Sequence, residues 1–184
     1  MNAPAKVLDK DGNELPGGRS LDEIHNDPQL LCEVAHVWIY DPFGWVLVQK
    51  RSINHPGDPG KWDVSAAGHL NAGESAENAA MREAKEELGI EIDLKQLEFI
   101  GRKYVEHMSL PANFLHNEYV NFYLLPIGKD TLKLSFDDGE VDDFEWIKFE
   151  DFQDETKNPE QNNYVSFDKA YYDFVTSEIK KRCG

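Results

Sequence analysis

The sequence has little positive charge, only two cysteines and no long apolar run, and each shortage argues against a class of protein. With 19 Lys and Arg residues against 35 Asp and Glu, the formal net charge is −16, so a nucleic-acid backbone and an anionic membrane surface both repel the chain. Cys32 and Cys183 lie far apart, which disfavours a disulfide framework and is compatible with a reducing cytoplasm. No apolar run approaches the roughly 18 residues of a membrane-spanning helix, and no signal peptide is recognisable. We therefore expect a cytoplasmic protein that binds neither nucleic acid nor membrane.

The length and hydrophobic content are those of one domain preceded by a short extension. At 184 residues with 40% hydrophobic residues, the chain can bury one sizeable core, and no period suggests repeats. The Asp11-Gly12 pair and the break at 16–18 predict a short hairpin, with a brief turn or helix over 19–25. We therefore divide the chain into an N-terminal extension, residues 1–30, and a domain over residues 31–184.

Alternating and β-branched apolar residues predict a sheet, and a helical apolar face predicts a closing helix. The predicted strands are 33–40, 45–50, 62–67, 97–105, 117–125 and 144–148, and the closing helix is 167–180. Tyrosines 164, 171 and 172 are either a dimer interface or the core and rim of a monomer, so the chain is expected to be a monomer or a homodimer. Selection of a ligand is expected in loops 52–61, 106–117 and 126–140.

The stretch from Gly68 to Ile90 carries the strongest chemical signal. If Ser75 caps a helix and Gly89 ends it, residues 76–88 make about three and a half turns. On that helix the side chains of Glu83, Glu86 and Glu87 share one face, beside a narrow apolar face. The members of the apolar face are Ala80, Met81, Ala84 and Leu88. The helix is therefore expected to dock on the sheet and to present its carboxylates beside the docked face.

Three like charges at this spacing repel each other, and a divalent cation would remove that repulsion. Carboxylate oxygens are the ligands that Mg²⁺ and Mn²⁺ prefer. The alternative is that Glu83, Glu86 and Glu87 form an ordinary solvated charged face, as in many helices rich in Glu and Lys.

The full spacing of this stretch resembles the Nudix box. The matching residues are Gly68, Glu74, Arg82, Glu83, Ala84, Glu86, Glu87, Leu88, Gly89 and Ile90. The resemblance implies a Nudix α/β/α sandwich with a mixed sheet between helices. It also implies that Glu83, Glu86 and Glu87 hold Mg²⁺ or Mn²⁺, with the Gly68 carbonyl as a further ligand. Arg82 and Glu74 would orient the ligands, and otherwise they form a surface ion pair.

A looser resemblance covers residues 6 to 180 and concerns the Nudix subgroup related to isopentenyl-diphosphate isomerase. It rests on the run Pro59-Gly60-Lys61-Trp62 to Gly68-His69-Leu70, with Asn117-Glu118 downstream. In the isomerase a catalytic cysteine precedes the Gly-His pair, whereas this chain has Ala67. The resemblance gives His69 a metal role and Glu118 a metal or acid/base role. The alternatives are a turn residue for His69 and a surface carboxylate for Glu118.

Several further residues are candidates for single roles. Arg51, Lys61 and His69 are candidate substrate contacts, although Arg51 and Lys61 are equally well explained as solvated ends of loops. One carboxylate without a metal would act as general base, and Glu86, Glu87, Glu118 and the weaker candidate Glu140 all qualify.

The predicted function is metal-dependent hydrolysis of a phosphoanhydride bond. The substrate would be a nucleoside diphosphate derivative or a similar small organic diphosphate, because the metal bridges phosphate oxygens and activates water. Two alternatives stay open: a protein related to the isomerase, disfavoured by Ala67, and a Nudix domain that binds a diphosphate without catalysis, disfavoured because every box carboxylate is present. Messenger RNA decapping is disfavoured by the acidic composition.

Overall fold

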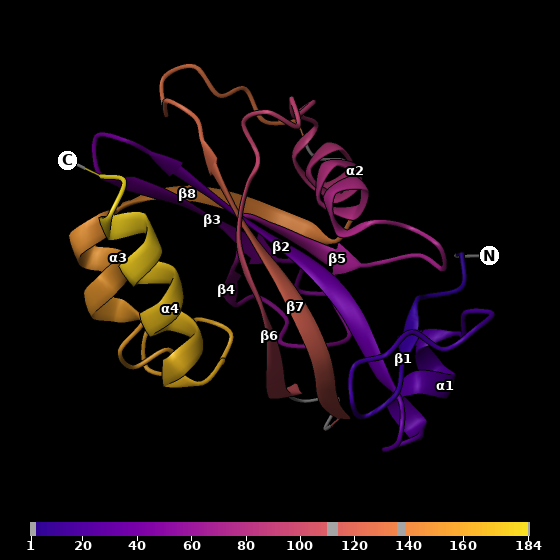
Figure 1. Ribbon diagram of the computed structural model, residues 1–184. Helices are drawn as coiled ribbons and strands as arrows, with labels where there is room; N and C mark the ends of the chain where they lie inside the picture. The colour runs from indigo at the N-terminus through magenta and orange to yellow at the C-terminus, as the bar shows by residue number, and fades with distance from the viewer. Residues whose placement is uncertain (1–2, 110–113, 136–138, 184) are drawn as a thin grey trace.

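The fold was analysed in a computed structural model that describes residues 3–109, 114–135 and 139–183. A mixed sheet lies between helices, which confirms the predicted fold class (Figure 1). The strands are β1 Val7–Leu8, β2 Leu31–Asp41, β3 Trp45–Arg51, β4 Trp62–Asp63, β5 Ala66–His69, β6 Glu98–Ser109, β7 Phe114–Pro126 and β8 Val141–Lys148. The helices are α1 Leu21–Asn26, α2 Ala76–Leu88, α3 Phe149–Glu155 and α4 Lys169–Lys180. No helix in the described part of the chain is long and apolar enough to cross a membrane.

Strand β2 is the centre of the sheet. Its eleven residues are all buried, and it pairs in parallel with β7 and antiparallel with β1, β3 and β5. The main path of the sheet runs β4-β3-β2-β7-β6. Off this path, β8 pairs antiparallel along β3. A strand that is apolar on both faces needs cover on both, and helices supply it.

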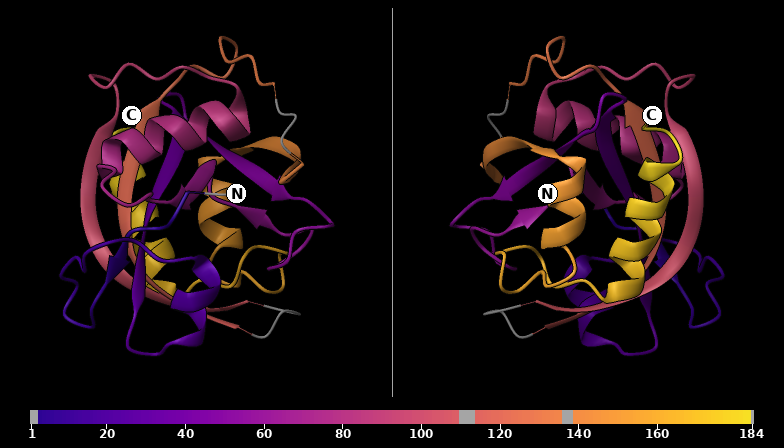
Figure 2. Two further views of the ribbon diagram at one scale, coloured as in Figure 1. Left: turned by 90° about the vertical axis from the view of Figure 1, so that its right-hand side faces the viewer. Right: turned by 90° about the vertical axis from the view of Figure 1, so that its left-hand side faces the viewer.

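Helix α2 covers one face and α3 with α4 cover the other (Figures 1 and 2). The side of α2 that faces the sheet carries the fully buried small residues Ala79, Ala80 and Ala84, which let the helix pack close to β5 and β2. Ser75 caps its first turn, and Gly89 ends it with a left-handed φ of 69°, as the sequence predicted. A larger aromatic cluster around Trp38 and Phe152 fills the opposite face.

The structure corrects three local predictions. The strand expected over 62–67 is split into β4 and β5, because the Ser65 hydroxyl bridges Ile39 N and Leu47 O at the break. The polar segment after β8 is helix α3, held by the buried side chains of Phe149 and Phe152. Much of the loop expected over 106–117 belongs to β6 and β7, which pair as far as Ser109 and Phe114; residues 110–113 lie outside the described residues.

The structure also decides between the two alternatives for the three tyrosines near the closing helix. Tyr164, Tyr171 and Tyr172 are all buried in the aromatic cluster. They are core residues because α4 packs its apolar stripe against the sheet, which is the second of the two alternatives that the sequence left open.

The first 30 residues pack against the sheet. β1 pairs with β2 at Leu31 and Cys32, and α1 begins with a capping box between Ser20 and Glu23. Leu8 bridges to Glu14 across a turn in which Gly12 has a φ of 80°. The division at residue 30 stays a prediction, but this segment brings the ring centroid of His25 to 6.1 Å from that of His69 on β5.

Candidate functional site

The carboxylates of α2 lie against strand β5 at Gly68. A Cβ atom at Gly68 would lie 1.9 Å from Oε1 of Glu83, so only glycine lets this carboxylate rest on the strand. The carboxylate of Glu83 therefore lies directly over the backbone of Gly68; the role of the Gly68 carbonyl as a metal ligand stays a prediction.

Arg82 joins three of the box glutamates. Its Nε and Nη2 atoms donate to the two oxygens of Glu74 at 3.0 and 2.9 Å. Its Nη1 atom donates to Oε1 of Glu83 at 2.5 Å and to Oε2 of Glu86 at 3.1 Å. A further bond from Nη2 reaches the carbonyl of His69. The guanidinium thus holds the carboxylates of Glu74, Glu83 and Glu86 from one end, and the orienting role expected of Arg82 stays a prediction.

Glu87 is the most deeply buried of the box carboxylates. Its Oε2 atom accepts hydrogen bonds from the backbone nitrogen of Ala67 at 3.0 Å and from Nε2 of Gln49 at 3.3 Å. Glu86, by contrast, keeps 56% of its side chain exposed. Both donors to Glu87 are neutral groups, so these two hydrogen bonds bring no positive charge to its carboxylate.

Two carboxylates of the box have raised pKa values. Burial raises the pKa of Glu83 to about 7, although the charge of Arg82 opposes the shift. Burial, and then the charge of Glu83, raise the pKa of Glu87 well above its usual range. Burial would also raise the pKa of Glu74, but its bonds to Arg82 outweigh burial and lower it. Two carboxylates with raised pKa values, side by side, favour a bound cation.

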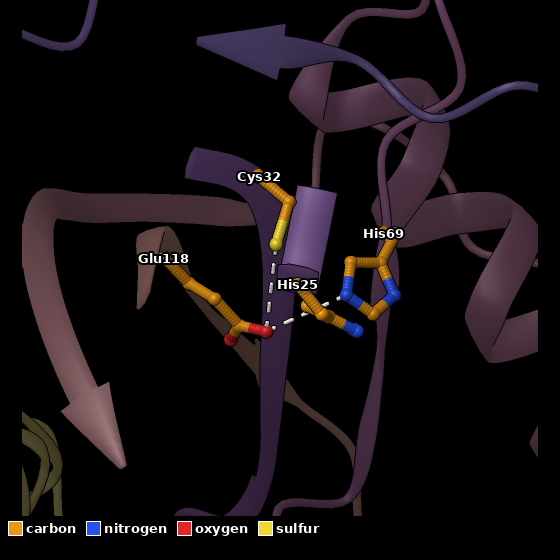
Figure 3. A group of neighbouring side chains, drawn as sticks. All are labelled: His25, Cys32, His69 and Glu118. Carbon is orange, nitrogen blue, oxygen red and sulfur yellow. Dashed lines mark hydrogen bonds and ion pairs between the residues drawn. The ribbon is translucent and has the colours of Figure 1, made fainter. Parts of the chain in front are cut away.

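A second cluster lies on the opposite face of β5. Because side chains alternate along a strand, His69 points away from α2 and toward Glu118 of β7, with 3.4 Å between Nε2 and Oε1. Cys32 of β2 has its Sγ atom 3.7 Å from the same oxygen, and His25 of α1 completes the group (Figure 3). One ligand atom from each of these four residues lies within 4.8 Å of the others.

Histidines control the charge of Glu118. Its Oε1 atom lies 3.0 Å from Nδ1 of His116. Burial alone would raise the pKa of Glu118, but bonds with His116 and His69 outweigh it and hold the pKa well below the usual range. Burial and the neighbouring Glu118 raise the pKa of the Cys32 thiol. A soft thiolate with imidazoles and a carboxylate is a donor set for a transition metal such as Zn²⁺.

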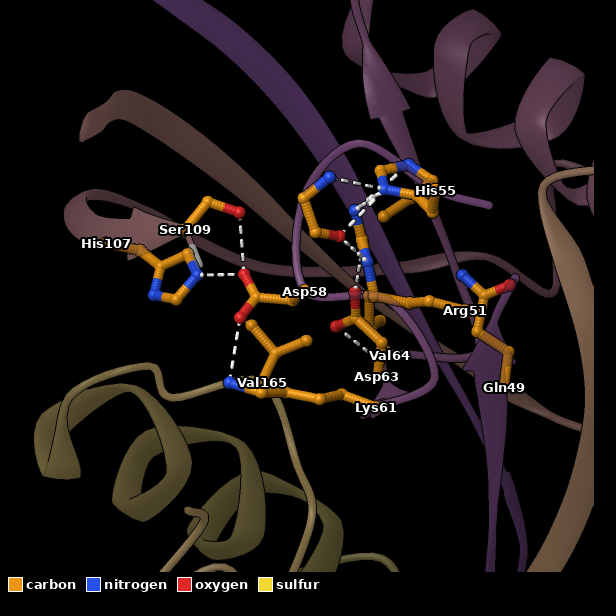
Figure 4. Close-up of polar contacts among 12 residues, drawn as sticks. Gln49, Arg51, His55, Asp58, Lys61, Asp63, Val64, His107, Ser109 and Val165 are labelled. Atoms are coloured by element: carbon orange, nitrogen blue, oxygen red, sulfur yellow. Dashed lines mark hydrogen bonds and ion pairs between the residues drawn. The ribbon is translucent and has the colours of Figure 1, made fainter. Parts of the chain in front are cut away.

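The two cationic side chains predicted to contact substrate, Arg51 and Lys61, bond to groups in and next to loop 52–61 (Figure 4). Arg51 donates from Nη1 to Asp63 at 2.6 Å and from Nε to the carbonyl of Gly57 at 2.9 Å. Lys61 pairs with Asp58 at 2.8 Å. These contacts hold the loop closed on itself, and they place both cations outside the direct contacts of the box carboxylates.

Sequence reasoning missed Gln49, His25, Cys32 and His116. None belongs to a local motif, since each comes from a different segment: β3, α1, β2 and β7. Glu140, the weaker candidate base, is exposed, but its charge contributes to the raised pKa of Glu87. The parallel register that sets Cys32 opposite Glu118 cannot be deduced from either residue's neighbours.

The family follows from a comparison with known domains. A model of the NUDIX domain matches residues 31–167. The chain belongs to the Nudix family. This confirms the family predicted from the box. The match takes in the box, β2, β7 and α3, and it begins at the first residue of β2.

Relatives include Nudix hydrolases and isomerases. The chain is 30% identical over 183 residues to Nudix hydrolase 3 of Arabidopsis thaliana, which covers 96% of this chain and 23% of that protein. It is 29% identical over 141 residues to isopentenyl-diphosphate Delta-isomerase 2 of Photorhabdus laumondii, covering 77% and 75%. The chain thus spans less than a quarter of the plant relative's length.

Solved structures share the fold. DR0079 from Deinococcus radiodurans has a TM-score of 0.66 at 19% identity and covers 97% of this chain and 98% of that one. An Ap4A hydrolase from C. elegans, solved as a binary complex, has a TM-score of 0.53 at 18% identity, covering 82% and 99%. At these identities the likeness concerns the fold alone.

Proposed function

We propose that the chain hydrolyses a phosphoanhydride bond of a nucleoside diphosphate derivative or a similar organic diphosphate, with Mg²⁺ or Mn²⁺ as cofactor. The observation that carries the proposal is the pair of buried carboxylates, Glu83 and Glu87, whose pKa values are raised beside Gly68. Hard carboxylate oxygens fit such a cation, and the residues that would hold it are Glu83, Glu86, Glu87 and the Gly68 carbonyl. When bound, the cation would screen substrate phosphates and lower the pKa of water.

The protein's own groups would then position this chemistry. Arg82 holds Glu83 and Glu86 in place from the side of Glu74, and Gln49 with Ala67 N fixes the rotamer of Glu87. A carboxylate in the box that is not occupied by metal would accept the proton of the attacking water. All three are proposed ligands, so the general base would be whichever of them the metal leaves unbound; Glu86, the most exposed, reaches solvent most easily.

We infer a second cation at His25, Cys32, His69 and Glu118. The donor types fit a softer metal than Mg²⁺, and the spacing of the four ligand atoms within 4.8 Å fits one ion. In this proposal His69 and Glu118 are metal residues of the second centre, and Glu118 does not serve the box. A structural role is proposed for this ion, because it would join α1 to β2, β5 and β7.

A relation to isopentenyl-diphosphate isomerase is the second candidate function, favoured by relatives such as the Photorhabdus protein. Ala67 opposes it, because no thiol precedes Gly68 to exchange a proton with an allylic carbon. Cys32 does not replace that thiol, since it is buried against Glu118 on a neighbouring strand.

The test is a phosphate-release screen of the purified chain with Mg²⁺ or Mn²⁺. The substrates are nucleoside triphosphates, nucleoside diphosphate sugars, dinucleotides and isoprenoid diphosphates, and Glu86→Gln is the blank. We expect turnover of one substrate class that is absent from the blank. Metal-dependent binding without turnover of any class would instead support a non-catalytic domain, and proton exchange on isopentenyl diphosphate would support the isomerase.

A further inference from the structure

Strand β6 is a long edge strand with an unusual surface. It spans twelve residues, and its backbone pairing within the described residues is with β7 alone. Figure 2 shows β6 at the outer side of the sheet, next to β7. Three of the chain's exposed large hydrophobic residues, Phe99, Tyr104 and Met108, lie on it and are 46 to 53% exposed. An edge of this kind is a template for pairing with another strand.

The edge at the other end of the sheet is protected in a way that β6 is not. β8 carries Asp142, Asp143 and Glu145, all exposed, so a second strand of the same kind would be repelled. β6 has two acidic residues, Glu98 and Glu106, and two basic residues, Arg102 and Lys103. The strand is therefore neutral in a chain of net charge −16, and here two copies can meet without local repulsion.

We propose that β6 pairs antiparallel with β6 of a second copy of this chain, with Tyr104 on the two-fold axis. In a continuous antiparallel sheet a perpendicular two-fold axis brings each residue opposite one of the same side-chain face. Centring the axis on Tyr104 sets Arg102 opposite Glu106 twice, Ile100 opposite Met108, and Lys103 opposite Val105. This proposal is independent of the proposed hydrolysis.

Neighbouring registers are worse by charge. An axis at Lys103 sets the two lysines opposite each other, and an axis at Arg102 sets the two arginines together and Glu98 against Glu106. An axis at Val105 sets Lys103 opposite His107 and leaves Arg102 opposite Met108. Opposite charges in a cross-strand pair stabilise and like charges destabilise, so charge selects Tyr104 among these four axes; an axis at Ile100 would also pair Arg102 with Glu98 but would overlap only residues 98–102 of the strand.

The side chains involved already lie on one face of the strand. Arg102 stacks 4.1 Å from the ring centroid of Tyr119, and its Nε atom bonds Glu33 at 2.7 Å. Glu33 also pairs with Lys6 and accepts from Asn121, so part of the Arg102 guanidinium can bond Glu106 of the second copy without leaving Glu33 bare. The hydroxyl of Tyr104 donates to Glu106 within the same chain, which places Glu106 beside the axis.

Paired charge variants test the register. Arg102→Glu and Glu106→Arg each create two like-charge contacts in a homodimer, and each should weaken self-association about tenfold or more. Mixed together, the two variants regain both opposite-charge contacts, so we expect a heterodimer of nearly wild-type strength by sedimentation velocity. Thermal unfolding of each variant controls for the lost bond to Glu33. A wild-type protein that stays monomeric throughout a dilution series, or a mixture that does not associate, would overturn the proposal.

Cross-linking supplies a second readout that does not depend on charge. Tyr104→Cys places two thiols opposite each other across the axis and should give a disulfide-linked dimer on mild oxidation. Lys103→Cys, which faces Val105 instead, is the matched control and should give little. Equal cross-linking of the two variants, or cross-linking of the control alone, would show that the strands do not meet in this register.

Discussion

The two sides of strand β5 carry two acidic centres with opposite electrostatics. On the α2 side, Glu83 and Glu87 crowd together and their pKa values are raised. On the other side, Glu118 lies among imidazoles and its pKa is lowered. One strand separates them, because Gly68 faces the first centre and His69 the second. Ionisation of Glu83 and Glu87 is therefore opposed within the protein, which is why we propose a cation there, whereas neighbouring histidines favour the ionised form of Glu118.

The largest expected effect comes from removing a charge on the α2 side. Glu87→Gln keeps the shape of a buried side chain but loses a metal ligand, so turnover of the substrate identified in the screen should fall on the order of 10³-fold. The measurement is kcat at saturating Mg²⁺. Glu150→Gln, an exposed carboxylate of α3, is the control and should leave kcat unchanged. Equal activity of wild type and Glu87→Gln would remove Glu87 from the metal site.

The contact between strand and helix can be broken without touching a charge. Gly68→Ala puts a methyl group where Oε1 of Glu83 lies, so the carboxylate must move or α2 must shift. We expect a loss of about 1–3 kcal/mol in the free energy of unfolding and weaker Mn²⁺ binding. Gly128→Ala is the matched control, since its added Cβ would make only an ordinary contact 3.4 Å from Thr131. Unaltered Mn²⁺ affinity in Gly68→Ala would contradict the shared site.

The pH dependence of stability sharpens the comparison. A carboxyl whose folded pKa is raised contributes stability that is present below its unfolded pKa of 4.5 and is lost as pH rises through about 7. In EDTA the free energy of unfolding should therefore fall over this window, by about 3 kcal/mol for Glu83. Saturating Mg²⁺ should remove most of the fall. The fall is measured by chemical denaturation at pH 5 and pH 8, once in EDTA and once in Mg²⁺. In EDTA, Glu83→Gln should reduce the difference in the free energy of unfolding between the two pH values.

The two centres also differ in how much of each could be predicted from the sequence. Helix α2, its caps and its acidic face follow from the periodic pattern and capping residues of one short stretch, so the helix and the family were predictable. The partners of those residues were not. Gln49 of β3 meets Glu87 of α2 across 38 positions, and Cys32 meets Glu118 across 86 because β2 pairs in parallel with β7. Such a register depends on the whole sheet and leaves no local pattern.

The same reason explains what local patterns left open or predicted wrongly in the fold. Tyr171 and Tyr172 each have a polar atom and their helix is mixed in composition, so the sequence could not decide whether they are buried; the cluster that buries them is built by β2, β3, β7, α3 and α4 together. Ser65 breaks a predicted strand because its hydroxyl finds partners on β2 and β3. In each case a long-range contact outweighed a local preference.

The smallest expected effect on turnover comes from the second centre. Cys32→Ser removes its soft ligand and leaves the box intact, so kcat should change less than about threefold. The content of bound Zn²⁺, measured by mass spectrometry of the purified chain, should fall. Cys183→Ser is the control, since that thiol lies near the carbonyl of Asp41 and away from the cluster. A wild-type protein without transition metal would count against a second ion.

The proposed hydrolysis depends most on the binding of a divalent cation in the box by Glu83, Glu86, Glu87 and the Gly68 carbonyl. The direct measurement is the anomalous difference density of a crystal soaked in Mn²⁺ near neutral pH. We predict a peak bounded by those four groups, with Arg82 still held by Glu74. A well-ordered crystal whose box glutamates remain bonded to Arg82 and show no peak between Glu83 and Glu87 would contradict the account.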